Sequence, residues 1–170
     1  MNRYLTEPYD GGVSHSDQAA LARLEVGVSA AVRWSESRHV KAEVARRSGC
    51  DLPGSELRLL EHFDVAEPMR VSDIAECLHI DMSTVSLQLR RLRADHLVER
   101  IPDPDDRRVT MVAITDAGRA TVARVRSARR ALLQEILSGA GPAELDRAAD
   151  ILLRVQAHML AGMPARPGTP

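Results

Sequence analysis

The sequence predicts a mainly α-helical protein with one small β-hairpin. Alanine and leucine, which favour helices, together make up about a quarter of the 170 residues. Aromatic residues, which favour strands and base-stacking surfaces, make up only 2%. Apolar residues recur at helical spacing along most of the chain, and the period becomes that of a strand only between Leu97 and Thr115.

Three helices are expected in the first part of the chain. Ser16 or Asp17 is a candidate N-cap for the first, which carries one apolar stripe. The second, over residues 40–47, is expected to end where Gly49 takes the left-handed conformation. A third amphipathic helix is expected after the turn at 53–55.

Two short helices separated by a break form the most informative pattern. Ser72 is expected to cap the first helix, and His79–Ile80 forms the break. Asp81 is then expected to cap a second helix, whose inward positions are Val85, Leu89 and Leu92. This pattern predicts a helix-turn-helix.

A β-hairpin is expected directly after this pair. Residues 97–101 favour a strand, 102–106 a turn, and 107–115 a returning strand. Thr115–Asp116 is expected to cap a long helix, and a final amphipathic helix follows the turn at 139–142.

The outward face of the second short helix is the candidate binding surface. Its expected members are Ser83, Thr84, Ser86, Gln88, Arg90 and Arg91. Hydroxyls near a helix N-terminus allow a close approach to the major groove of DNA, and Gln and Arg carry donors for base edges and phosphates. An ordinary solvated helix face is the alternative interpretation.

The hairpin tip favours the nucleic-acid interpretation. Arg107 and Arg108 follow Asp105 and Asp106, so a carboxylate can hold a guanidinium extended for insertion into the narrow minor groove. A protein-interaction module that does not bind DNA would be expected to lack these arginines.

From about Asp17 to Leu160, the chain resembles the MarR (multiple antibiotic resistance regulator) family of bacterial winged helix-turn-helix transcription factors. The resemblance rests on the order and spacing of the motifs at 71–75 (VSDIA), 83–86 (STVS), 97–100 (LVER), 103–108 (DPDDRR) and 114–118 (ITDAG). It implies a recognition helix over about 82–95, with Arg108 in the minor groove and Asp106 as the residue that orients it. His79 and His96 stand where the family usually has glycine.

The resemblance also implies a single domain over 17–160 that forms a homodimer. Dimerisation helices are expected in 17–50 and 119–160, and the winged helix-turn-helix in 55–115. The terminal helices carry more apolar positions than one small winged domain can cover, which agrees with a dimer; folding back on their own chain is the alternative. Residues 1–16 and 161–170 are expected to be flexible.

The expected function is a ligand-responsive repressor that binds double-stranded DNA at a pseudo-palindromic operator. Family members respond to small, often aromatic or phenolic molecules, to cysteine oxidation, or to metals. Residues on segments that could line an effector cleft are Trp34, Arg38, His39, His62 and Phe63, although core packing explains Trp34 and Phe63 equally well. Cys50 is a candidate oxidation sensor if it is exposed beside Arg46 and Arg47.

Enzymes are the opposing class, and the sequence argues against them. It contains no HExxH, GxSxG or GxGxxG motif, and its single lysine, Lys41, lies in no phosphate-binding loop. No cofactor is predicted, and the six histidines form no local metal motif, although a site assembled in space stays open. No apolar run approaches the roughly 20 residues of a membrane-spanning helix, and the N-terminus lacks a signal peptide, so a cytoplasmic protein is expected.

Overall fold

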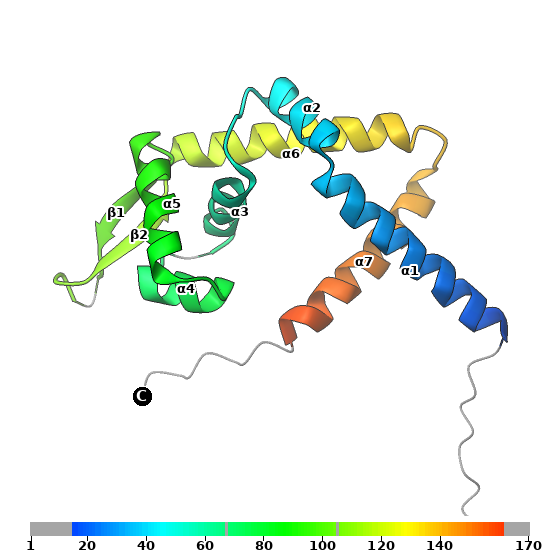
Figure 1. Ribbon diagram of the computed structural model, residues 1–170, viewed down its shortest axis with the longest axis horizontal. Helices are drawn as coiled ribbons and strands as arrows, with labels where there is room; N and C mark the ends of the chain where they lie inside the picture. The colour runs from blue at the N-terminus through cyan, green and yellow to red at the C-terminus, as the bar shows by residue number, and fades with distance from the viewer. Residues whose placement is uncertain (1–14, 67, 105, 162–170) are drawn as a thin grey trace, which may run out of the picture. The chain divides into compact units, whose positions relative to one another are not determined.

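A computed structural model describes residues 15–66, 68–104 and 106–161 of the chain (Figure 1). Its elements are α1 (His15–Glu36), α2 (Arg38–Ser48), α3 (Gly54–Phe63), α4 (Val71–Leu78), α5 (Met82–Ala94), β1 (Val98–Pro102), β2 (Thr110–Ile114), α6 (Asp116–Ile136) and α7 (Pro142–Ala161). The predicted fold class, helices plus one antiparallel hairpin, is confirmed. Most of the two termini predicted to be flexible lies outside the described residues.

The chain divides into two compact units, with the boundary inside α6 between Ala128 and Arg129. The first unit contains α1 to α5, the sheet and the first part of α6. The second contains the end of α6 and α7. Across the described ranges, no helix combines the length and the apolar composition that crossing a bilayer requires.

The core of the first unit holds the two short helices and the hairpin together. Helix α5 packs against α3, α4 and β1, and α3 also contacts β2. In the sheet, Val98 pairs with Ile114 and Pro102 with Thr110, and Met69 adds an isolated bridge to Val112. The main buried core residues are Leu59, Leu60, Phe63, Ile74, Val85, Leu89, Leu92, Val98, Val112 and Val122. Burying each such side chain stabilises the fold by about 1.5–3 kcal/mol. The apolar side of α5 is therefore held in the core, and its opposite side is left exposed.

Left-handed residues end three helices. Gly49 follows α2 with φ 64°, as predicted. His79 forms the break between α4 and α5 with φ 51°, and His96 has φ 57° in the turn before β1. Histidine adopts this region more readily than β-branched residues do. Histidine thus takes the left-handed conformation at both positions where the family usually has glycine.

Two predicted N-caps are wrong. Helix α4 already begins at Val71, so Ser72 lies in its first turn and its hydroxyl donates to Asp73 Oδ1. Helix α1 begins at His15, so Ser16 and Asp17 are inside it. A capping residue only permits a helix start, and the packing of the helix decides which turn is the first. Asp81 does occupy the N-cap of α5, although its side chain makes no capping hydrogen bond.

The start of α6 is attached closely to the turn before β1. Thr115 Oγ1 accepts a hydrogen bond from the Gly118 N–H at 3.1 Å, as a capping residue should, and donates to the His96 carbonyl at 2.7 Å. A Cβ on Gly118 would collide with the Leu97 carbonyl oxygen and lie 2.7 Å from Ile114 Cγ1. Glycine is therefore required here for close approach, and not for a special φ value.

Candidate nucleic-acid interface

The outward face of α5 carries most of the predicted binding residues. Ser83, Thr84, Ser86, Arg90 and Arg91 are exposed, whereas Gln88 is half-buried. They face outward because the apolar stripe of α5 is buried against α3, α4 and β1. Hydroxyls occupy the N-terminal half of this face and guanidinium groups the C-terminal half. The surface thus offers short donors and acceptors first, and long cationic donors after them.

Arg91 has a structural partner that the sequence analysis did not identify. Its Nη1 donates to Glu56 Oε1 of α3 at 2.7 Å, and the Glu56 side chain is only 1% exposed. Ser55 Oγ donates to the other carboxylate oxygen at 3.0 Å. Burial raises the pKa of Glu56, but hydrogen bonds from Arg91 and Ser55 outweigh it and hold the pKa below its ordinary value.

This ion pair joins the recognition helix candidate to α3. The Arg91 side chain remains 58% exposed while its Nη1 is bound to Glu56. The Arg90 side chain, by contrast, makes no hydrogen bond or ion pair with any residue that the structure describes. The two neighbouring arginines therefore differ in kind: one is anchored and the other is available.

The hairpin is attached to the helices through Asp103. This residue is buried at the end of β1, and its Oδ2 accepts from Arg70 Nη2 at 2.8 Å. The hydrogen bond from Arg70 to Asp103 raises the pKa of Arg70. Asp103 Oδ1 also accepts from the Asp106 N–H at 3.4 Å. The turn is thereby positioned relative to the N-terminus of α4.

At the hairpin tip, Asp106 contacts Arg108 twice. Its Oδ1 accepts from the Arg108 backbone N–H at 3.0 Å and from Nε at 3.4 Å. The Arg108 side chain is 93% exposed, and Arg107 is exposed as well. An ion pair this exposed contributes only about 0–1 kcal/mol to stability, so its consequence is the direction of the guanidinium. Asp105, the other predicted acidic residue of this turn, lies outside the described residues.

Cys50 was a candidate oxidation sensor only if its thiol were exposed, and the structure buries it. Its backbone N–H donates to Ser48 Oγ at 3.2 Å, and the Ser48 carbonyl accepts from Arg124 Nε of α6 at 3.1 Å. These bonds hold the segment after α2 against α6. The contact between Ser48 and Arg124, which lie 76 positions apart, could not be inferred from the local sequence.

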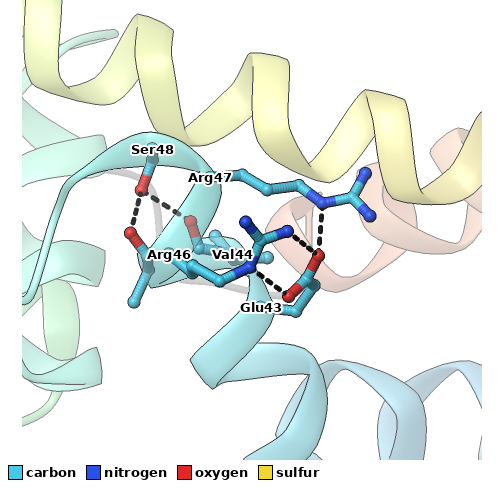
Figure 2. A network of polar contacts seen from close by, with 6 residues as sticks. Glu43, Val44, Arg46, Arg47 and Ser48 are labelled. Atoms are coloured by element: carbon cyan, nitrogen blue, oxygen red, sulfur yellow. Dashed lines mark hydrogen bonds and ion pairs between the residues drawn. The ribbon is translucent and has the colours of Figure 1, made fainter.

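The arginines that precede Cys50 bind a carboxylate of their own helix. Arg46 and Arg47 both contact Glu43, at distances of 2.6–2.8 Å (Figure 2). Hydrogen bonds from Arg46 and Arg47 lower the pKa of Glu43 to about 2. The positive charges of Arg46 and Arg47 therefore lie against the Glu43 carboxylate.

The effector candidates are distributed over different environments. Phe63 is fully buried in the core, which supports the packing interpretation for it. Trp34 and His62 are half-buried, and Arg38 and His39 are exposed. Within the parts of the chain that the structure describes, no three His, Cys, Asp or Glu side chains lie close enough together to hold a metal ion.

Comparison with known proteins relates this architecture to one group of regulators. Residues 52–110 match the model of the MarR family. The chain is 31% identical over 110 residues to the uncharacterized HTH-type transcriptional regulator YxaD of Bacillus subtilis, covering 65% of this chain and 76% of that protein. It is 32% identical over 77 residues to the HTH-type transcriptional repressor IacR of Pseudomonas putida, covering 45% and 46% of the two chains.

A solved structure shares the fold. Streptococcus pneumoniae FabT, crystallised in complex with DNA, aligns over 83% of this chain and 98% of its own, with a TM-score of 0.60 and 18% identity. At this identity the likeness concerns the fold alone. The relatives in sequence are named as regulators, in agreement with the lack of catalytic motifs.

Proposed function

This chain belongs to the MarR family, and on that premise we propose that it is a DNA-binding transcriptional repressor that acts as a homodimer in the cytoplasm. The observation that carries the proposal is the combination, in one compact unit, of an outward polar face on α5 with an exposed arginine that Asp106 orients at the hairpin tip. If the outward face of α5 were only an ordinary solvated surface, there would be no reason for an exposed, oriented arginine at the hairpin tip.

In the proposed complex, α5 enters the major groove. Ser83 and Thr84 lie at its N-terminal end, where recognition helices approach the base edges, and Ser86, Gln88 and Arg90 follow. Arg91 contacts a phosphate with the nitrogens that Glu56 leaves accessible. Arg108 enters the minor groove, where the narrow walls strengthen its attraction to the DNA.

Exposed apolar residues on the terminal helices support dimerisation. Such residues in α1 are Leu21, Leu24, Val26 and Val32, and those in the second unit are Leu133, Ile136, Leu137, Leu145, Ile151, Leu152, Leu153 and Val155. Exposed apolar surface of this extent is typical of protein interfaces. A twofold-related copy burying these residues would present two α5 helices to successive major grooves about 34 Å apart, and hence to a pseudo-palindromic operator.

We further propose that a small aromatic or phenolic effector binds between the dimer helices and the winged region. Trp34, Arg38, His39 and His62 supply apolar and cationic groups suited to such a molecule. A thermal-shift screen of phenolic acids against matched aliphatic acids tests this part, with stabilisation by the phenolic series as the expected result.

Mobility shift and fluorescence anisotropy with DNA selected from the source genome test the main proposal. Arg90→Ala and Arg108→Ala should each weaken binding by roughly 1–3 kcal/mol. Arg130→Ala, an exposed arginine of the second unit, is the matched control and should leave the affinity nearly unchanged. Full retention of affinity in both test variants would reject this DNA surface.

The dimer has a separate test in sedimentation velocity. Leu152→Asp should convert the native dimer into monomers or insoluble protein, because burying a charge in an apolar interface costs several kcal/mol. A soluble dimer of unchanged stability would show that α7 is not in the interface.

A further inference from the structure

Leu87 is an apolar residue on the exposed, polar side of α5, so packing in the core does not explain why it is apolar. The helix buries Val85, Leu89 and Leu92 on one side, and Leu87 lies on the opposite side with 46% of its surface exposed. Leu87 is absent from the expected binding surface because that surface was defined by polar outward residues. The spacing from Val85, Leu89 and Leu92 was sufficient to place it, since two residues beyond Val85 is a rotation of about 200° around the helix.

The neighbours of Leu87 on the helix surface are all members of the proposed DNA face. Residues three and four positions away are adjacent on a helix, and these are Ser83, Thr84, Arg90 and Arg91. Leu87 is therefore at the centre of that face, surrounded by hydroxyl and guanidinium groups. A ring of this polarity is a poor match for an apolar protein partner and a good match for the edges of base pairs.

In the major groove, an apolar side chain has one apolar complement. Among the four bases, thymine alone presents a methyl group there, beside its hydrogen-bond acceptor. A leucine that contacted the cytosine N4 amino group would leave a donor without a partner, which costs free energy. An apolar side chain at the position of Leu87 would therefore favour thymine over cytosine, a distinction that the hydroxyls and arginines around it make less directly.

We propose that Leu87 is a specificity-determining residue that contacts the 5-methyl group of a thymine in each operator half-site. This inference rests on the proposed DNA-binding function. Its energetic signature is small and local: loss of the methyl contact should weaken binding about four-fold per half-site, the equivalent of ~0.8 kcal/mol for one methylene-sized apolar group.

The test removes the methyl group from the DNA and the leucine from the protein independently. A high-affinity site is first selected from a random duplex library with the native dimer. Each thymine of the site is then replaced in turn by deoxyuridine, which lacks only the 5-methyl group, and the dissociation constant is measured for the native protein and for Leu87→Ala. Val65→Ala, at an exposed apolar residue outside α5, is the matched control.

We expect one thymine per half-site at which deoxyuridine weakens native binding about four-fold and leaves Leu87→Ala binding unchanged. Val65→Ala should respond as the native protein does. Equal responses of native and Leu87→Ala proteins at every thymine, or a selected site without thymine in its half-sites, would overturn the inference about Leu87 while leaving DNA binding intact. Failure of the native dimer to enrich any sequence would overturn the proposed function and this inference with it.

Discussion

Removing Arg91 should destabilise the fold, whereas removing its neighbour Arg90 should not. The Arg91→Ala substitution leaves the Glu56 carboxylate, which is 1% exposed, with only the Ser55 hydroxyl as a side-chain donor. A hydrogen bond to a charged group contributes about 1.5–3 kcal/mol, and breaking a fully buried ion pair costs about 3–5 kcal/mol. Since Arg91 is more than half exposed and partly screened by water, we expect a loss of about 2 kcal/mol.

Urea unfolding followed by circular dichroism, at equal protein concentration for every variant, measures this loss. With a slope of about 2 kcal/mol per molar urea, the midpoint should fall by about 1 M. Arg90→Ala makes the same side-chain change one position earlier and should shift the free energy of unfolding by less than about 0.5 kcal/mol. Alanine favours helices at least as well as arginine, so helix propensity does not account for a difference between the two variants.

Two further measurements attribute the loss to the buried carboxylate. Adding Glu56→Gln to Arg91→Ala should recover about half of the lost stability, because a neutral amide is cheaper to bury than a charge. In the native protein the pKa of Glu56 is lowered, so its contribution is present above the ordinary pKa and disappears as the pH falls. In Arg91→Ala the unpaired, buried carboxyl should have a raised pKa, so the deficit relative to the native protein should shrink between pH 8 and pH 5.

The reasoning would be refuted if Arg91→Ala were as stable as Arg90→Ala. It would also fail if Glu56→Gln did not rescue Arg91→Ala, since the cost would then have another origin. In the first case Arg91 would belong with Arg90 among residues that act only on a partner, and in the second the loss of stability would not come from the buried Glu56 carboxylate.

Three further predictions concern the packing around the interface. Gly118→Ala should destabilise the fold by about 1–3 kcal/mol in urea unfolding, because the added Cβ collides with the Leu97 carbonyl oxygen; wild-type stability would contradict that close contact. Asp103→Asn removes the charge that binds Arg70, so it should weaken DNA binding several-fold, as measured by fluorescence anisotropy. An unchanged affinity would show that DNA binding does not depend on this attachment of the hairpin. Burial lowers the pKa of His62, so the unfolded chain binds more protons and stability should fall as the pH drops below about 6.5. His62→Gln should reduce that pH dependence in thermal unfolding, and an identical pH profile would exclude His62 as its source.

Much of the local structure was predictable, because it depends on residues close together in the chain. The helix end at Gly49, the break at His79 and the capping of α6 by Thr115 all follow from backbone preferences of single residues. The inward stripe of α5 follows from its apolar spacing, and the hairpin from the change of period. The N-cap of α4 was misplaced by two residues, at Ser72 in place of Arg70, because several positions there can serve as the first turn.

By itself, the sequence determined the order and type of the elements, the buried side of α5 and the pairing of acidic and basic residues at the hairpin tip. Only the tertiary structure decided that Glu56, a charged residue, is buried, because its partner Arg91 lies 35 positions away on another helix. The same holds for Cys50, which packing around Ser48 and Arg124 removes from solvent. The apolar period of a helix predicts which of its sides is buried. The free-energy cost of burying a charge or a thiol depends instead on the groups that distant segments of the chain place next to it.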